Sequence, residues 1–240
     1  MEFSAYREMS EQQDTHWWFK GRRKILTVLL KSLNLNKSAE ILEIGCGPGG
    51  NLKLLKKFGQ VSAVEMNPYA LEEAKKNNGV KLESGYLPDN LPFGDKQFDA
   101  IFLFDVLEHV EQDKFAIQAI NERLKRGGHL IITVPALPFL FGKHDKELHH
   151  FRRYTKKSLI NLLNQENFTV QFSTYFNFLL LPLAISSRIF DKMFKLNRAT
   201  FINSVLYQIF SFESIMLNYF HLPIGLSICC VVKKNEESKL

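Results

Sequence analysis

The chain has 240 residues, 45% of them hydrophobic and 23% charged, and its 31 basic against 25 acidic residues give a formal net charge of +6. This length and composition are typical of one globular domain with a single core. The three cysteines, of which Cys229 and Cys230 are adjacent in an apolar run, form neither a disulfide framework nor a metal-ligand spacing, which excludes both classes. The positive charge favours an anionic partner without naming one.

The first 38 residues predict a helical lid ahead of the first strand. The segment HWWFKGRR (16–23) combines bulky aromatic side chains with arginines. Aromatic faces suit a cationic ligand and arginines suit an anionic one, so we expect Trp17 and Arg22 to contact the substrate. A helix packed against the sheet edge for burial alone is the alternative. Residues 1–8 lack a basic start followed by an apolar run, so no secretory signal is predicted and we expect a cytoplasmic protein.

Strand-like and helix-like segments then alternate, which predicts a doubly wound, Rossmann-like α/β sheet. The expected strands are 40–45, 61–65, 80–83, 98–104, 128–134, 168–176 and 226–233, and the expected helices are 50–58, 69–77, 112–125 and 155–165. In such a sheet a ligand binds at the carboxyl ends of the strands. We therefore expect a cofactor-binding core over residues 39–176.

A glycine-rich turn follows the first strand, in the segment ILEIGCGPGG (41–50). Glycines let the backbone bend sharply and approach a ligand, and they leave helix amides facing it. Gly45, Gly47 and Gly50 also fit the dinucleotide fingerprint, with Glu65 at about the position of its ribose-binding acid. Glu43, however, would lie beside the anionic pyrophosphate of a dinucleotide. Charge therefore favours a cationic sulfonium ligand, and the carboxylate of Glu65 could accept hydrogen bonds from its ribose hydroxyls.

The chain resembles the class I S-adenosylmethionine-dependent methyltransferases over roughly residues 16–176. The motifs that carry the resemblance are EIGCGPG (43–49), VEMN (64–67), LPF (91–93), FD (98–99), DVLEHV (105–110), LKRGGHLI (124–131), VPA (134–136) and RRY (152–154). The resemblance implies S-adenosylmethionine as the cofactor and an antiparallel last strand, residues 225–233, between the fifth and sixth. The cofactor residues it implies are Glu43, Gly45, Cys46, Gly47, Gly49, Glu65, Met66, Gly85, Tyr86, Leu87, Asp105 and Val106. Many members place an acid after the third strand to meet the adenine amine, whereas this chain has SGYL (84–87), so adenine is expected to meet backbone and apolar groups.

Two segments supply candidate catalytic residues. After the fourth strand, Asp105 should border the methionine end of the cofactor, and His109 begins the wall of the acceptor pocket. After the fifth strand, His144 and Asp145 are expected to form a base and its orienting partner, with His149 as a further base. The resemblance to the ubiquinone-pathway O-methyltransferases also offers Asp105, Glu108 and His109 as ligands of a divalent cation. No metal is expected, because Glu108 and His109 more simply cap the next helix and orient one another.

The loop HDKELHHFRRY (144–154) is also a candidate substrate site. Arg152 and Arg153 can hold a phosphate or carboxylate bidentately, and Tyr154 lies beside them, so we expect all three to contact the substrate. A charged loop pinned by salt bridges to Asp145 and Glu147 is the alternative.

Residues 177–224 form an apolar insertion between the sixth and seventh strands, where a short turn would suffice. We interpret it as two amphipathic helices joined by a basic stretch that includes Arg188, Lys192, Lys195 and Arg198, interleaved with Phe190, Phe194 and Leu196. That pattern suits an anionic membrane surface on the inner face of the membrane. Packing on the sheet, or on a second copy in a homodimer, is the alternative. A transmembrane span and a nucleic-acid partner are both disfavoured, and the tail, 234–240, looks solvated.

Together these features predict methyl transfer from S-adenosylmethionine to a small or lipid-linked acceptor, with O-methylation preferred. The alternatives are an NAD-dependent oxidoreductase, which Glu43 disfavours, and a non-catalytic, membrane-associated protein that binds the cofactor without turnover.

Overall fold

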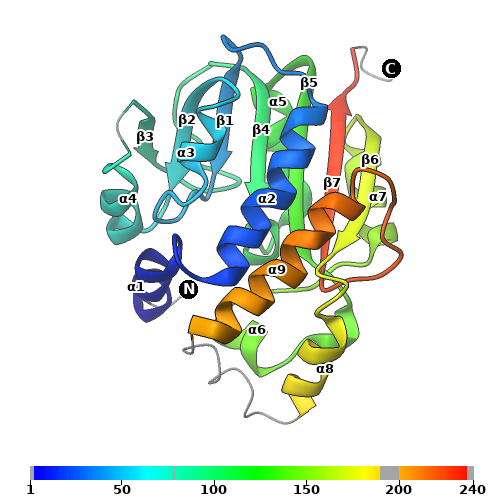
Figure 1. Cartoon of the computed structure of the whole chain (residues 1–240). Coiled ribbons are helices and arrows are strands. Elements are labelled where there is room, and N and C mark those ends of the chain that lie inside the picture. The colour runs from blue at the N-terminus through cyan, green and yellow to red at the C-terminus, as the bar shows by residue number, and fades with distance from the viewer. Residues whose placement is uncertain (1–2, 78, 190–199, 237–240) are drawn as a thin grey trace.

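The computed structural model describes residues 3–77, 79–189 and 200–236, and in this part of the chain seven strands form one sheet (Figure 1). The strands are β1 (Glu40–Ile44), β2 (Gln60–Glu65), β3 (Lys81–Ser84), β4 (Phe98–Phe104), β5 (Leu124–Pro135), β6 (Phe168–Phe176) and β7 (Ser227–Lys234). Their order is β3-β2-β1-β4-β5-β7-β6, and β7 runs antiparallel to both of its neighbours. The expected place and direction of the last strand are therefore confirmed.

Helices cover both faces of the sheet. They are α1 (Phe3–Gln12), α2 (Trp17–Ser32), α3 (Leu52–Leu55), α4 (Pro68–Ala74), α5 (Asp113–Arg123), α6 (Lys143–Glu147), α7 (Lys156–Gln165), α8 (Leu181–Ile189) and α9 (Thr200–Met216), with short 3-10 turns at Leu107–His109 and Pro138–Leu140. One apolar core lies between the sheet and α2, α3 and α9, and a second lies between the sheet and α5 and α7. Figure 1 shows α2 and α9 side by side across the front of the sheet.

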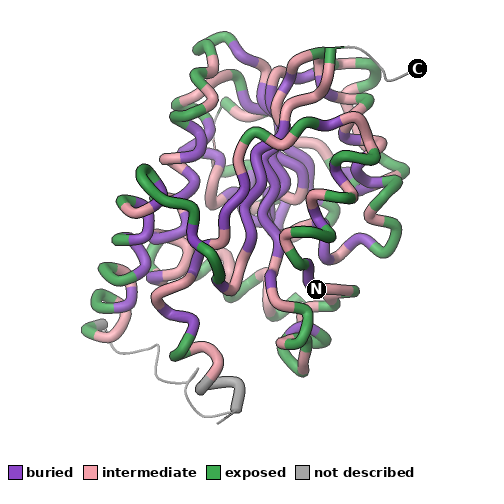
Figure 2. The backbone as a smooth tube through the Cα atoms, turned by 90° about the vertical axis from the view of Figure 1, so that its right-hand side faces the viewer, coloured by how far each residue is buried: buried purple, intermediate pink, exposed green. Residues whose placement is uncertain are grey.

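The central strands are buried on both faces, which explains their nearly continuous apolar sequences. All of β4 except Asp99 is buried, and Phe98 and Phe102 are among the largest fully buried side chains. Figure 2 shows these strands as the buried centre of the molecule. Parallel strands covered by helices on both sides require such sequences rather than strict alternation.

The predicted elements are present, but some of their bounds differ. The helix expected over 50–58 is only the single turn α3, because Gly49 and Gly50 belong to the preceding turn. After α3 the chain packs against β1 at Gly59, where a side chain would clash with the backbone oxygen of Ala39. The fifth strand begins at Leu124 rather than at 128, because Leu124 pairs with Phe98 ahead of a bulge.

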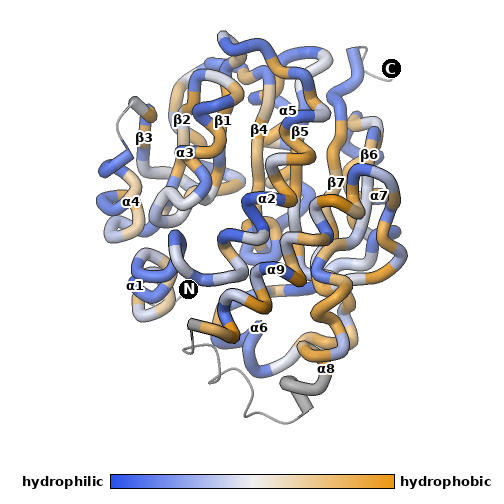
Figure 3. The backbone as a smooth tube through the Cα atoms, in the orientation of Figure 1, coloured by the Kyte–Doolittle hydropathy of each residue, from blue (hydrophilic) through white to orange (hydrophobic). Residues whose placement is uncertain are grey.

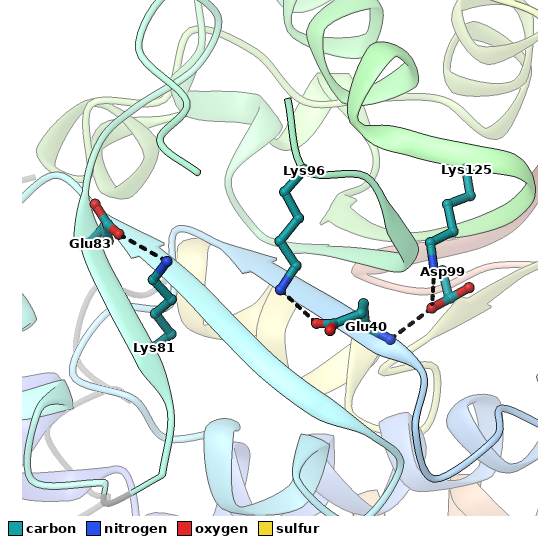
Figure 4. A network of polar contacts seen from close by, with 6 residues as sticks. All are labelled: Glu40, Lys81, Glu83, Lys96, Asp99 and Lys125. Atoms are coloured by element: carbon teal, nitrogen blue, oxygen red, sulfur yellow. Dashed lines mark hydrogen bonds and ion pairs between the residues drawn. The ribbon is translucent and has the colours of Figure 1, made fainter. Parts of the chain in front are cut away.

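A network of ion pairs fixes the amino ends of the strands (Figure 4). The Asp99 carboxylate accepts a hydrogen bond from the backbone nitrogen of Glu40 at 2.7 Å and pairs with Lys125 Nζ at 2.9 Å. Lys96 Nζ lies 2.7 Å from Glu40 Oε2. Asp99 thus joins β1, β4 and β5 at the edge of the sheet opposite to the carboxyl ends, which gives this motif residue a structural role.

The segment between β6 and β7 contains α8 and α9. Figure 3 shows hydrophobic residues along both helices. α9 packs on α2, where the rings of Trp17 and Phe210 meet edge to face at 5.6 Å and Gly21 leaves room for Phe210. The basic stretch with Lys192, Lys195 and Arg198, and residues Phe190, Phe194 and Leu196, lie outside the described residues. No helix in the described ranges has the length and apolar character needed to cross a membrane.

Candidate functional site

A cavity of about 1820 Å³ opens at the carboxyl ends of the parallel strands. One part is lined by the glycine-rich turn after β1, the end of β2 and the turn after β4. The other is lined by apolar residues of α8 and α9, among them Leu183, Ile202 and Leu206. Pockets for a single drug-sized ligand have volumes of about 300–1,000 Å³. The cavity therefore has room for a nucleoside cofactor and a second molecule.

The glycine-rich turn needs its glycines for both conformation and space. Gly45, Gly47 and Gly49 have φ values of +70°, +55° and +89°, which side chains rarely adopt. A Cβ on Gly45 would also lie 2.5 Å from Val106 Cγ2. The turn after β1 and the turn after β4 are thus in contact.

Glu65 ends β2 with a buried carboxylate that several donors hold. The backbone nitrogens of Gly47 and Asn67 each donate to it at 2.8 Å, and the hydroxyl of Tyr6 on α1 donates as well. Burial outweighs these bonds and raises the pKa of Glu65. Tyr6 was not predicted as a site residue, and it shows that α1 covers the cavity at the place where a ribose would meet Glu65.

Glu43 lies behind the glycine-rich turn and is not among the described residues that line the cavity. Asn51, which does line it, donates to Glu43 Oε1 at 2.9 Å, while Glu43 Oε2 has no hydrogen-bond partner. Burial raises the pKa of Glu43 to about 7. The structure thus connects Glu43 to the cavity through Asn51, and direct contact with the cofactor stays a prediction.

Asp105 follows β4 with a left-handed φ of 55° and is held from two sides. Arg22 Nη2 lies 2.9 Å from Asp105 Oδ2, and the Thr133 hydroxyl donates to Asp105 Oδ1 at 2.9 Å. Arg22 Nη2 also donates to that hydroxyl at 2.9 Å. Arg22 was predicted to bind substrate; it lines the cavity, but its charge is already matched by Asp105.

Glu108, His109 and His150 meet at the wall of the cavity, and each offers a ligand atom within 4.8 Å of the others. This group differs from the predicted metal set, because His150 takes the place of Asp105. Burial and the nearby Asp105 raise the pKa of Glu108 well above its usual range. Burial and the adjacent His150, whose ring centroid lies 4.6 Å away, lower the pKa of His109 to about 4. The group therefore combines a buried carboxyl with a neutral imidazole.

Asp145 anchors the loop after β5. Its side chain is fully buried, and its carboxylate pairs with Arg153 Nε at 2.7 Å and with His150 Nδ1 at 3.0 Å. Although burial alone would raise the pKa of Asp145, hydrogen bonds from His150 and Arg153 hold it well below its usual range. The cavity lining includes the exposed His144 and His149, and Asp145 orients His150 from behind. The predicted pairing of His144 with Asp145 stays a prediction.

The predicted substrate residues of this loop separate into two groups. Arg153 lines the cavity but is occupied by Asp145 and by the backbone oxygen of Ala136, at 3.0 Å. Arg152 pairs with Asp113 at 2.7 Å, and the Tyr154 hydroxyl donates to the same carboxylate at 2.9 Å. These two side chains pin the loop to α5 through Asp113, a partner other than the Asp145 and Glu147 of the salt-bridged alternative, and substrate contact by Arg152 and Tyr154 stays a prediction.

Most predicted cofactor residues line the cavity. These are Gly45, Cys46, Gly47, Glu65, Met66, Asp105 and Val106, together with Trp17 from the predicted substrate set. Gly49, Gly85, Tyr86 and Leu87 are not among the described lining residues. Gly85 instead makes room for a tight turn, in which the backbones of Tyr86 and Asn90 exchange hydrogen bonds of 2.9 and 3.1 Å.

The residues that sequence reasoning missed are Tyr6, His150 and the α9 wall residue Leu206. Tyr6 and Leu206 come from parts of the chain with no motif of their own, and His150 lies in the loop 144–154 without being singled out there. The tandem histidines at 149 and 150 were the one available signal for His150.

Comparison with known proteins places this fold and this glycine-rich turn in a family. The profile of a methyltransferase domain matches residues 16–175. The ubiquinone biosynthesis O-methyltransferase of Schizosaccharomyces pombe is 25% identical over 65% of this chain and 64% of its own length. The demethylmenaquinone methyltransferase of Tropheryma whipplei is 27% identical over 69% of this chain and 66% of its own. The chain thus spans slightly less than two thirds of the length of these curated relatives.

Solved structures agree on the fold. The phosphoethanolamine N-methyltransferase 2 of Haemonchus contortus, solved with S-adenosyl-L-methionine, superposes with a TM-score of 0.59 at 14% identity, over 96% of this chain and 60% of that one. The chain belongs to the methyltransferase-domain family, and its fold is the one that this solved methyltransferase shares.

Proposed function

We propose that this protein transfers the methyl group of S-adenosylmethionine to a hydroxyl group of a small or lipid-linked acceptor. The observation that carries the proposal is one cavity of about 1820 Å³, whose lining includes the glycine-rich turn, the imidazoles of His109, His144, His149 and His150, and an apolar wall on α8 and α9. A polar reaction centre at one end and an apolar wall at the other suit an acceptor with a polar head and a hydrocarbon body.

The residues of the turn fit the cofactor. Gly45 has no room for a side chain, and Gly45 and Gly47 both have the left-handed φ that favours glycine. Glu65 offers a buried carboxylate to the ribose hydroxyls. Asp105 lies at the end of β4, beside the place expected for the methionine portion. When bound, S-adenosylmethionine supplies a methyl group already activated on a sulfonium, so the protein has to orient the acceptor and exclude water.

His109 is the proposed base. It is half-buried, it lines the cavity and it adjoins His150, which Asp145 orients. In this role its imidazole accepts the proton of the acceptor hydroxyl as the oxygen is methylated. His144 and His149 line the same cavity from the loop after β5 and are proposed to contact the acceptor, as are Trp17 and Arg153.

The apolar wall of the cavity and the names of two relatives support the proposed acceptor class. Two curated relatives carry names that refer to quinone methylation, and quinone precursors are phenols with apolar tails. The family match disfavours the NAD-dependent oxidoreductase. We further propose that the protein works in the cytoplasm and visits the inner face of the membrane.

Calorimetric titration with S-adenosylmethionine, S-adenosylhomocysteine and NAD tests the cofactor. Binding of the two adenosyl ligands without NAD is expected, and a Gly45→Arg variant should lose it while keeping its circular dichroism spectrum. NAD binding alone would overturn the proposal.

The acceptor and the base need a second assay, with polyprenylated and short-chain phenols as acceptors. His109→Gln should lower kcat with little change in KM for S-adenosylmethionine. Equal activity of His109→Gln and wild type would remove His109 as the base, and a failure to methylate any phenol would remove the acceptor class.

A further inference from the structure

Helix α9 is apolar on two opposite faces. Its inner face buries Leu206 and Phe210, followed by Leu217, against α2 and the sheet. Its outer face exposes Phe201 at 78%, Phe212 at 54% and Ile215 at 55%. The outer stripe, as we name it, consists of Phe201, Val205, Ile209, Phe212, Ile215 and Tyr219. Their spacing of three or four residues places these side chains along one side of the helix.

The outer stripe contains no charge. From residue 200 to residue 220 the sequence has one charged residue, Glu213. Glu213 is fully buried, and its carboxylate accepts hydrogen bonds from the backbone nitrogens of Asn177 at 2.6 Å and Leu179 at 2.8 Å. A helix that faces water normally places charged residues on its outer side. The outer face of α9, on which the exposed Ser204 and Gln208 are polar but uncharged, is therefore suited to an apolar environment.

Cations lie along the flank of this helix. Lys20 Nζ and Lys24 Nζ, both from α2, lie 4.7 and 5.6 Å from the ring centroid of Tyr207 on α9. An apolar helix face bordered by lysines, with aromatic side chains at both ends, is the pattern of helices that lie in the interface of an anionic bilayer. A second copy of this chain would bring the same lysines together, so charge favours the bilayer over a homodimer.

The described part of α9 is too short to cross a bilayer. Its 17 residues reach about 26 Å, whereas a bilayer core of about 30 Å needs about 20 apolar residues. The inner face is also committed to α2. α9 can therefore lie flat, with only the outer stripe below the headgroups.

The inner flank of α9 borders the cavity. Ile202 and Leu206 line it, and Asn203 ties the helix to the start of α2 by accepting a hydrogen bond from the backbone nitrogen of Trp17 at 2.7 Å. We propose that the outer stripe docks on an anionic lipid bilayer and brings the apolar wall of the cavity to the membrane surface. A lipid acceptor then reaches the cavity without crossing water. The docking itself does not depend on the proposed function; the delivery of acceptor does.

Vesicle flotation with the whole chain tests the docking. Wild-type protein should float with phosphatidylcholine vesicles that contain phosphatidylglycerol, and less well without the anionic lipid or at high salt. The triple variant Phe201→Ser, Phe212→Ser, Ile215→Ser should partition at least about tenfold more weakly, since three apolar side chains no longer leave water. The matched control is Phe115→Ser on α5, where Phe115 is 56% exposed, and it should float like wild type.

Three outcomes would overturn the docking proposal. The first is wild-type protein that stays in the soluble fraction at low salt, and the second is equal flotation of wild type and triple variant. The third is a wild-type dimer, detected by light scattering, that the triple variant abolishes while neither protein floats. Calorimetry with S-adenosylmethionine on each protein separates the two proposals. Flotation without cofactor binding would sink the methyltransferase function alone, and cofactor binding without flotation would sink the membrane surface alone.

Discussion

Arg22 and Asp105 form an ion pair of 2.9 Å between the N-terminal helix α2 and the carboxyl end of β4. Thr133 of β5 bonds to both side chains, so three elements meet at one point. The Arg22 guanidinium also lies over the Trp18 ring, 4.8 Å from its centroid. This pair fixes Asp105, with its left-handed backbone, at the predicted methionine end of the cofactor.

Arg22→Met should destabilise the protein by about 3 kcal/mol, the lower end of the cost of removing one partner from a buried ion pair, because Asp105 stays partly exposed. Urea unfolding measures this. Arg23→Met is the control, since Arg23 lies 3.7 Å from the exposed Asp14 and should cost less than about 1 kcal/mol. If both variants lost the same free energy of unfolding, the ion pair of Arg22 with Asp105 would contribute no more than an exposed ion pair does.

Glu65→Gln should weaken S-adenosylmethionine binding by about tenfold to a hundredfold, because charge-assisted hydrogen bonds contribute about 1.5–3 kcal/mol. Calorimetry gives the dissociation constant. Glu83→Gln on the adjacent strand β3 removes a carboxylate that pairs with Lys81 at 3.6 Å and should leave the affinity unchanged. If Glu65→Gln bound as tightly as wild type, the ribose would have to lie elsewhere.

Because of Glu43, the free energy of unfolding should fall as the pH rises. Its pKa in the folded protein is about 7, raised from 4.5 by burial, so folding favours the protonated form. The stability from this proton is complete below about pH 4.5 and is lost as the pH rises through about 7, a change of about 3 kcal/mol.

We expect the difference in unfolding free energy between wild type and Glu43→Gln, measured from pH 4 to 8, to report the titration of Glu43 alone. Glu122→Gln, at an exposed position on α5, provides the baseline. A difference that does not vary with pH would contradict the buried, proton-binding carboxyl.

Chelation should leave methyl transfer unchanged. Glu108, His109 and His150 offer one carboxylate and two imidazoles, whereas magnesium takes oxygen ligands. An assay after treatment with EDTA tests this expectation. A loss of activity that magnesium or manganese restores, and that Glu108→Gln makes permanent, would instead place a cation on these three residues.

The glycine-rich turn, the acids Glu43 and Glu65 at two strand ends, and the alternation of strands and helices could be predicted from the amino-acid sequence, because each depends on residues close together in the chain. Resemblance to a family added the antiparallel last strand. Only the tertiary structure brought Tyr6 to Glu65, Arg22 to Asp105 and His150 to Glu108, and only it buried Asp145 beneath the loop it anchors. These partners are separated in the sequence by loops, helices or a left-handed turn, so their distances are set by packing, which no local pattern encodes.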